Sequence, residues 1–129
     1  MDGSSGDALL YSDETFRIRR AIFAVHNAMG SGFLEAVYQE CLALELRRQG
    51  VAFEASKPLR LTYRGEALRQ SYVTDFVCYD RIIVELKAVR TLAPEHRAQT
   101  INYLRAAGMR LGLLVNFGAA SAEIERFAL

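Results

Sequence analysis

Two apolar stretches in the middle of the chain are interrupted by three charged residues whose types suit metal-assisted chemistry: Asp75, Glu85 and Lys87. Residues two apart in a strand point to the same face, so Glu85 and Lys87 share a face of the second stretch. A three-residue loop over 79–81 would place Asp75 opposite Glu85, with Cβ atoms about 5 Å apart. Carboxylates that close repel each other unless a positive charge lies between them. Mg²⁺ suits this place because one or two carboxylates commonly bind it together with substrate phosphate.

An ordinary salt bridge on a half-exposed sheet would use the same residue types. The residues around the charges argue against a surface salt bridge, because the same strand faces carry apolar side chains: Val73, Val77, Ile83 and Val89. Burying unpaired charge costs several kcal/mol, and sequences usually break a local pattern in this way at functional sites. Spacing and patterning alone leave both interpretations open.

Further polar residues are expected near this pair. Glu35 follows the glycine turn 30–32 and shares a helix face with Tyr38, although taken alone it is better explained as an acid favoured by the helix N-terminus. On a later helix, His96, Gln99 and Tyr103 lie on one face. That stripe either contacts substrate phosphates and orders the lysine and a metal-bound water, or is a solvated helix face.

The elements that position these residues follow from apolar spacing and from glycine and proline signals. Helices are predicted from Ser12 to about Met29, from about Phe33 to Gln49, and from Pro94 to Ala107. Strands are predicted within 51–63, at about 68–78 and 82–89, and at 111–115, and a short helix over 120–129. The stretches 68–78 and 82–89 have the composition of central strands. This order predicts an α/β (α+β) fold with helices against a sheet.

The bulk composition fits one domain of ordinary soluble character. The chain has 129 residues, of which 51% are hydrophobic and 24% charged, and residues 9–129 are expected to form a single domain. Residues 1–8 are polar and small and are predicted to be a flexible leader, not a signal peptide. We therefore expect a cytoplasmic location and no membrane partner, since no apolar run reaches the length of a membrane helix.

The charge leaves the partner open. A net charge of +1 creates no global field that would attract nucleic acid. Fourteen of the sixteen basic residues are Arg, whose planar fork matches phosphate geometry. A codon bias toward Arg explains that preference equally well.

Several motifs follow one another in an order known from one family. Residues 32–38 match the pattern GxxExxY, and Asp75-Phe76, the segment 83–88, the segment 99–104 and the segment 111–118 come after it. With these motifs the chain resembles the GxxExxY proteins, a branch of the PD-(D/E)XK nuclease-like superfamily, over nearly everything from Leu9 to Phe117. One departure is Thr74, which stands where the superfamily often has a proline.

The resemblance implies a restriction-endonuclease-like αβββαβ core with an additional N-terminal helix and a mixed central sheet flanked by helices. It implies Mg²⁺ or Mn²⁺ as the cofactor, with these ligands: Asp75, Glu85, the backbone carbonyl of Leu86, and Glu35. Lys87 would orient the attacking water and stabilise charge that develops on the phosphate. Gln99 and Tyr103 match a QxxxY element that supports the active site and the substrate.

The function expected from this set is metal-dependent hydrolysis of phosphodiester bonds in nucleic acid, with DNA as the leading target. Arg60, Arg90 and Arg97 are candidates for flanking phosphates. The main alternative is a catalytically silent nuclease-fold module that binds nucleic acid or a partner protein, and a regulatory subunit with a vestigial site is another. Specificity is expected to come from a homodimer or from a partner protein.

Overall fold

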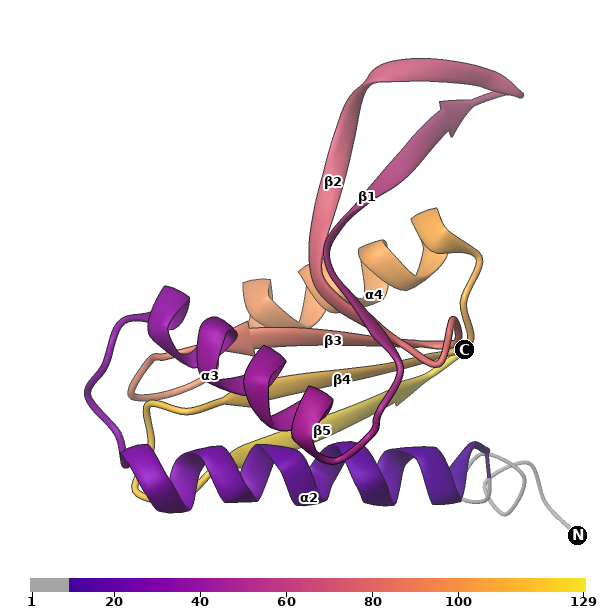
Figure 1. The fold of residues 1–129 in the computed structure, drawn as a ribbon. Helices are drawn as coiled ribbons and strands as arrows, with labels where there is room; N and C mark the ends of the chain where they lie inside the picture. The colour runs from indigo at the N-terminus through magenta and orange to yellow at the C-terminus, as the bar shows by residue number, and fades with distance from the viewer. Residues whose placement is uncertain (1–9) are drawn as a thin grey trace, which may run out of the picture.

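The structure is a computed structural model that describes residues 10–129, so the predicted leader over residues 1–8 lies outside the described residues (Figure 1). The described helices are α2 (Ser12–Met29), α3 (Glu35–Arg48) and α4 (Pro94–Ala107). The strands are β1 (Phe53–Tyr63), β2 (Glu66–Cys78), β3 (Ile82–Lys87), β4 (Leu111–Asn116) and β5 (Glu123–Ala128). The predicted αβββαβ order, preceded by one additional helix, is confirmed.

The strands form one mixed sheet in the order β1-β2-β3-β4-β5. Strands β3 and β4 are parallel, and the crossover between them is α4, while the other neighbours are antiparallel. The predicted three-residue connection holds, because Cys78 pairs with Ile82 and Val77 with Ile83. This register fixes which face of the sheet each of the charged residues occupies.

Helices cover both faces of the sheet. On one face, apolar side chains of α2 and α3 such as Ile22 and Leu42 pack in one cluster with Phe76, Val84 and Val115 of the sheet. On the other face, α4 packs its own apolar side chains against the opposite-pointing residues of β2 and β3. Along the described chain, residues 10–129, no helix combines the length and the apolar character needed to cross a membrane.

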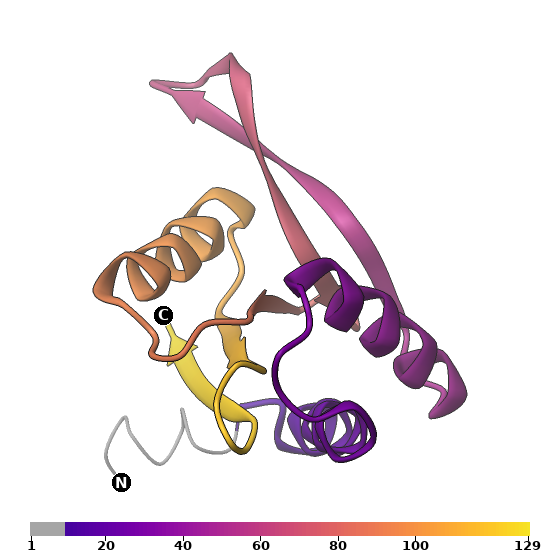
Figure 2. The same ribbon diagram turned by 90° about the vertical axis from the view of Figure 1, so that its left-hand side faces the viewer.

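Strands β1 and β2 extend beyond the sheet as a two-stranded arm, defined here as residues 60–73 (Figures 1 and 2). Every residue of the arm is exposed except Leu61, which is half-buried. The prediction that 68–78 is throughout a central strand is therefore wrong for its first half, where Val73 is 52% exposed. Apolar β-formers in this stretch, such as Val73, pair with β1 alone and stay exposed.

The predicted helix over 120–129 is also wrong, since these residues contain the edge strand β5. Residues 123–128 pair with β4 over its whole length. Ile124 and Ala128 pack on the α2 side of the sheet, whereas Phe127 packs on the α4 side. Pairing with a fully buried strand and packing on both faces outweigh the helix-forming tendency of Glu, Ala and Leu, because β preference depends strongly on context.

Candidate active site

The two carboxylates of the middle strands bond to each other's backbone where the β2–β3 ladder ends. The last paired residues are Phe76 and Val84. One step further, Glu85 Oε1 accepts a hydrogen bond from the backbone N–H of Asp75 at 2.9 Å, and Asp75 Oδ2 accepts one from the backbone N–H of Leu86 at 2.8 Å. The side chains thus replace the ladder at the point where β2 bends away into the arm.

Thr74 adds a third bond to this arrangement. Its hydroxyl donates to Glu85 Oε1, and both side chains are buried, Thr74 completely and Glu85 to 4% exposure. A buried carboxylate is stable only when its oxygens are hydrogen-bonded or balanced by charge. Thr74 and the Asp75 N–H provide this for one oxygen of Glu85.

The remaining oxygens of the pair have no such donor. Among residues 10–129, no N–H or hydroxyl other than those just named donates to Asp75 or Glu85. Burial, and after it the charge of Asp75, raises the pKa of Glu85 to about 8. Burial also raises the pKa of Asp75, against the opposing effect of the Leu86 N–H. With a pKa of about 8, the Glu85 carboxyl is mostly protonated at neutral pH, which relieves the repulsion between the two groups.

Lys87 lies at the end of β3, two residues beyond Glu85, and its charge is felt by Asp75 and Glu35. Asn116 and Phe117, at the end of β4, form a strap that holds the backbone just after Lys87. The Asn116 amide bonds to both the N–H and the carbonyl of Val89, and the Phe117 N–H donates to the Lys87 carbonyl. These bonds end β3 at Lys87, two residues before the predicted end.

Glu35 is the first residue of α3 and remains exposed, yet partial burial of its carboxylate raises its pKa. Lys87, Asp75 and His96 all act on its charge, which places it beside the pair. The turn before it is fixed by Tyr38, whose buried hydroxyl donates to the Gly30 carbonyl and accepts from the Phe33 N–H. The spacing of glycine, glutamate and tyrosine in residues 32–38 thus has a physical role here, since the tyrosine fixes the turn that precedes the glutamate.

The predicted stripe on α4 is divided in the structure. His96 caps the helix, because its Nδ1 accepts the Ala93 N–H. Tyr103 is buried against the sheet, and burial followed by the charges of Glu85 and Asp75 raises its pKa. Gln99 lines a hollow beside Tyr103. Tyr103 thus lies near the carboxylate pair and Gln99 beside Tyr103, so the prediction of a purely solvated helix face is not supported.

The three arginines singled out for phosphate binding differ in their surroundings. Arg97 is paired with Glu125, because its guanidinium donates two hydrogen bonds of 2.8 Å to that carboxylate. Its proposed phosphate role is therefore not supported. Arg60 lies on the arm and Arg90 in the loop after β3, and both are exposed.

The donor chemistry of the pair fits a hard divalent cation. Two carboxyl groups, each with an oxygen that no N–H or hydroxyl of residues 10–129 occupies, are the ligand type that Mg²⁺ and Mn²⁺ prefer. Within residues 10–129, no group of three or more His, Cys, Asp or Glu side chains is arranged to hold a metal. The protein therefore presents a two-carboxylate site, and ligation by Glu35 or by the Leu86 carbonyl stays a prediction.

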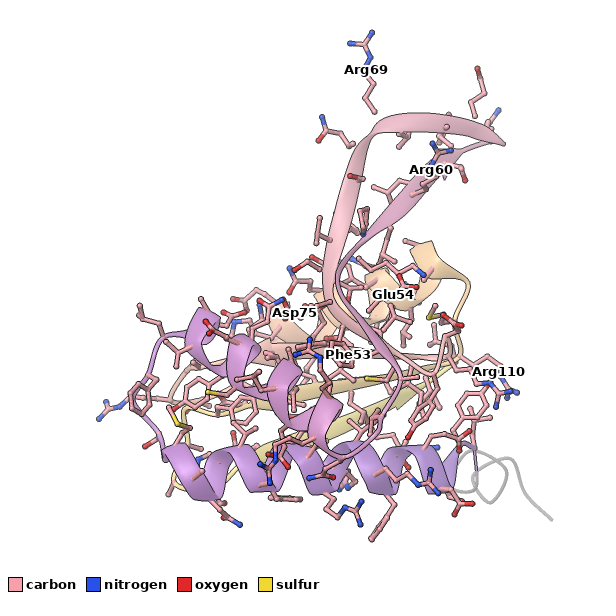
Figure 3. All side chains as sticks on the ribbon, in the orientation of Figure 1. Phe53, Glu54, Arg60, Arg69, Asp75 and Arg110 are labelled. Carbon is pink, nitrogen blue, oxygen red and sulfur yellow. The ribbon has the colours of Figure 1, made fainter. Side chains whose placement is uncertain are left out.

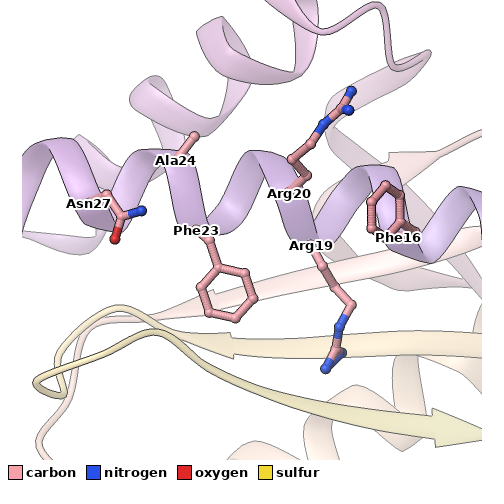
Figure 4. A pocket seen from close by; sticks show the side chains of 6 residues that line it. All are labelled: Phe16, Arg19, Arg20, Phe23, Ala24 and Asn27. Atoms are coloured by element: carbon pink, nitrogen blue, oxygen red, sulfur yellow. The ribbon is translucent and has the colours of Figure 1, made fainter.

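A hollow on another part of the surface lacks the side chains needed for this chemistry. It has a volume of about 540 Å³ and lies on the outer face of α2, where Phe16, Arg19, Arg20, Phe23, Ala24 and Asn27 line it (Figure 4). It contains no acidic or nucleophilic side chain. Four titratable groups with raised pKa values, Glu35, Asp75, Glu85 and Tyr103, instead act on one another around the carboxylate pair.

Two contributors to the site were not predicted from the sequence. Thr74 was noticed only as a departure from proline, and Asn116 only as part of a motif. Both are polar residues in otherwise apolar strands and both are completely buried. That signal, a polar residue on a buried strand next to a charged one, would have singled them out.

A family model described as "PD-(D/E)XK nuclease superfamily" matches residues 12–127. No curated protein and no solved structure gave a significant match.

Proposed function

The chain belongs to the PD-(D/E)XK nuclease superfamily, and from this membership and the geometry of its carboxylate pair we propose that it is a divalent-metal-dependent nuclease that hydrolyses phosphodiester bonds in DNA. The motif order further supports a place in its GxxExxY branch. The observation that carries the proposal is the pairing of the buried Glu85 with the half-buried Asp75, with oxygens left over for a cation. A fold has no need to bury such charges for stability, because an apolar pair would cost less.

In this proposal Asp75 and Glu85 hold Mg²⁺ or Mn²⁺, with the Leu86 carbonyl and Glu35 as further ligands. A bound cation would polarise the phosphate and lower the pKa of a coordinated water. The bonds from Thr74 and the two backbone N–H groups keep the carboxylates in place before the substrate arrives. Such preorganisation avoids rearrangement during the reaction.

Lys87 is proposed to orient the attacking water and to balance the negative charge that grows on the phosphate. Its position supports this role, because its charge already acts on both Asp75 and Glu35. The strap from Asn116 fixes the backbone beside it. Gln99 and Tyr103 are proposed to contact the substrate next to the pair.

Cleavage of single-stranded and duplex DNA in the presence of Mg²⁺ or Mn²⁺ tests the proposal. Asp75→Ala and Lys87→Ala should each abolish cleavage, while the matched control Asp13→Ala, at an exposed position of α2, should cleave normally. Cleavage that survives both site substitutions would refute the mechanism. Absence of both cleavage and specific Mn²⁺ binding in the wild type would favour the silent binding module.

Specificity is proposed to come from a homodimer or from a partner protein. The membership of the superfamily supports nucleic acid as the common target. The mass in solution with and without an oligonucleotide distinguishes a dimer from a monomer. A cytoplasmic location also stays a proposal, tested by fractionation of cells that express the chain.

A further inference from the structure

Two hollows that share lining residues lie between the arm and α4, and Tyr103, whose pKa responds to the charges of Glu85 and Asp75, lines one of them. One hollow of about 340 Å³ is lined by residues that include Tyr72, Gln99 and Asn102. A second hollow of about 510 Å³ shares Tyr72 and Asn102 with the first and extends to Arg60 and Arg105. We call the two together the arm groove.

The start of the groove is an aromatic platform. Tyr72 is 38% exposed, and its ring lies 4.8 Å from that of Tyr103 at a tilt of 38°. Tyr103 is buried in the apolar cluster between α4 and the sheet, so it gives the Tyr72 ring a fixed support. An exposed aromatic ring on a fixed support is the usual platform for stacking a nucleobase.

The far end of the groove is basic and lacks a counter-charge. Arg60 on β1 and Arg105 on α4 are exposed, and in the described residues neither forms an ion pair. Arg97 on the same helix differs from them, since it forms an ion pair with Glu125. Figure 3 shows Arg60 and Arg69 on the arm and Asp75 at its base, so positive charge continues outward from the site.

The size and chemistry of the groove select one kind of occupant. Both hollows fall within the volume of ordinary ligand sites, about 300–1,000 Å³, and each is too small to take in a duplex. Gln99 and Asn102 carry amides that both donate and accept hydrogen bonds, as base edges require. Stacking surface, amides and unpaired arginines together match an unpaired strand.

We propose that the arm groove binds a single-stranded segment of DNA, with a base stacked on Tyr72 and the backbone phosphates held by Arg60 and Arg105. This inference rests on the proposed nuclease function and adds to it the form of the substrate. The strand would run from the outer part of the groove toward Asp75 and Glu85. An unpaired end or flap is then the substrate, because paired bases offer no free face to Tyr72.

Binding of a fluorescein-labelled single-stranded DNA oligonucleotide, measured by anisotropy in EDTA, tests the proposal without cleavage. Tyr72→Ala should weaken binding about tenfold, Tyr72→Phe should restore it, and the wild type should bind the duplex of the same sequence more weakly. The double variant Arg60→Gln/Arg105→Gln should flatten the slope of log K against log salt by about 1.4, from about 0.7 for each lost phosphate contact on a single strand. Arg19→Gln on α2, which removes the same charge elsewhere, should bind normally.

Equal binding of single strand and duplex, or wild-type binding by the Tyr72 and arginine variants, would overturn the proposal. Thermal melting of each variant shows that the fold is intact, which is expected for exposed positions. The outcome is separable from that of the nuclease assay. Single-strand binding without any cleavage would contradict the proposed activity alone, whereas cleavage that is unaffected by these substitutions would contradict the groove alone.

Discussion

Asp75 and Glu85 each accept a backbone hydrogen bond from the other's strand, at 2.8 and 2.9 Å, in the place where the β2–β3 ladder would otherwise continue. The carboxylates are therefore part of the strand pairing as well as of the site. Beyond them β2 leaves the sheet and becomes the arm. One pair of residues thus couples the proposed metal site to the departure of the arm from the sheet.

The raised pKa of Glu85 makes stability depend on pH. Its value is about 8 in the folded protein against an ordinary 4.5, so between these values the folded state binds more protons than the unfolded state. The free energy of unfolding therefore falls as pH rises through this window, by at most about 1.4 kcal/mol per pH unit. Asp75, whose pKa is also raised by burial, adds in the same direction.

Glu85→Gln should remove much of this dependence, because the amide oxygen still accepts from Thr74 and Asp75 but cannot ionise. We expect the variant to gain stability over the wild type as pH rises from 5 to 8.5, in urea unfolding with EDTA present. The exposed Glu40→Gln on α3 serves as the control and should follow the wild type at every pH. A constant difference between Glu85→Gln and wild type across this range would contradict the prediction.

Metal should stabilise the protein through the same pair. Mn²⁺ at about one hundred times its dissociation constant should add about 2.7 kcal/mol to the free energy of unfolding. Asp75→Asn keeps the shape of the side chain but removes the charge, and it should abolish the shift seen in thermal melting. Asp13→Asn should retain it. An undiminished shift in Asp75→Asn would show that the cation binds elsewhere.

Much of this arrangement was predictable because it depends on local spacing. The bounds of α4 were predicted correctly from Pro94 and Gly108, and the three-residue loop gave the register that places Asp75 beside Glu85. The strand at residues 123–128 was not predicted, because these residues form a strand only through pairing with β4. The exposure of the arm was not predicted either, since the identity of an apolar residue such as Val73 does not reveal whether a helix covers it.

Thr74 should matter for activity through Glu85. Thr74→Val keeps the shape of the side chain but leaves Glu85 Oε1 with the Asp75 N–H alone. Loss of a bond to a buried carboxylate costs about 1–3 kcal/mol, so Mn²⁺ affinity and cleavage should both fall by about fivefold or more. Thr74→Ser retains the hydroxyl and should restore both, measured by calorimetry and by initial cleavage rates. Equal affinity in Thr74→Val and wild type would rule out this role.

Gly118 should be essential for the position of Lys87. A Cβ at this glycine would lie 2.2 Å from the Val89 carbonyl oxygen, and backbone atoms cannot yield as a side chain does. Gly118→Ala should therefore displace the segment after Lys87 and reduce the cleavage rate more than Mn²⁺ affinity, since the carboxylates stay in place. Gly112→Ala is the matched control on β4, because its Cβ would meet only the Leu104 side chain at 3.2–3.3 Å. Similar cleavage rates in the two variants would contradict the prediction.

Tyr38 should contribute to activity through the turn that carries Glu35. Its hydroxyl joins the Gly30 carbonyl and the Phe33 N–H, while its ring stacks on Phe117 at 4.6 Å. Tyr38→Phe keeps the stacking and removes only the two hydrogen bonds, at a cost in stability of about 1–2 kcal/mol. If the turn positions Glu35, cleavage should fall in Tyr38→Phe but not fall further in the double variant Tyr38→Phe/Glu35→Gln compared with Glu35→Gln alone. Additive losses in this cycle would mean that Tyr38 supports the fold without positioning Glu35.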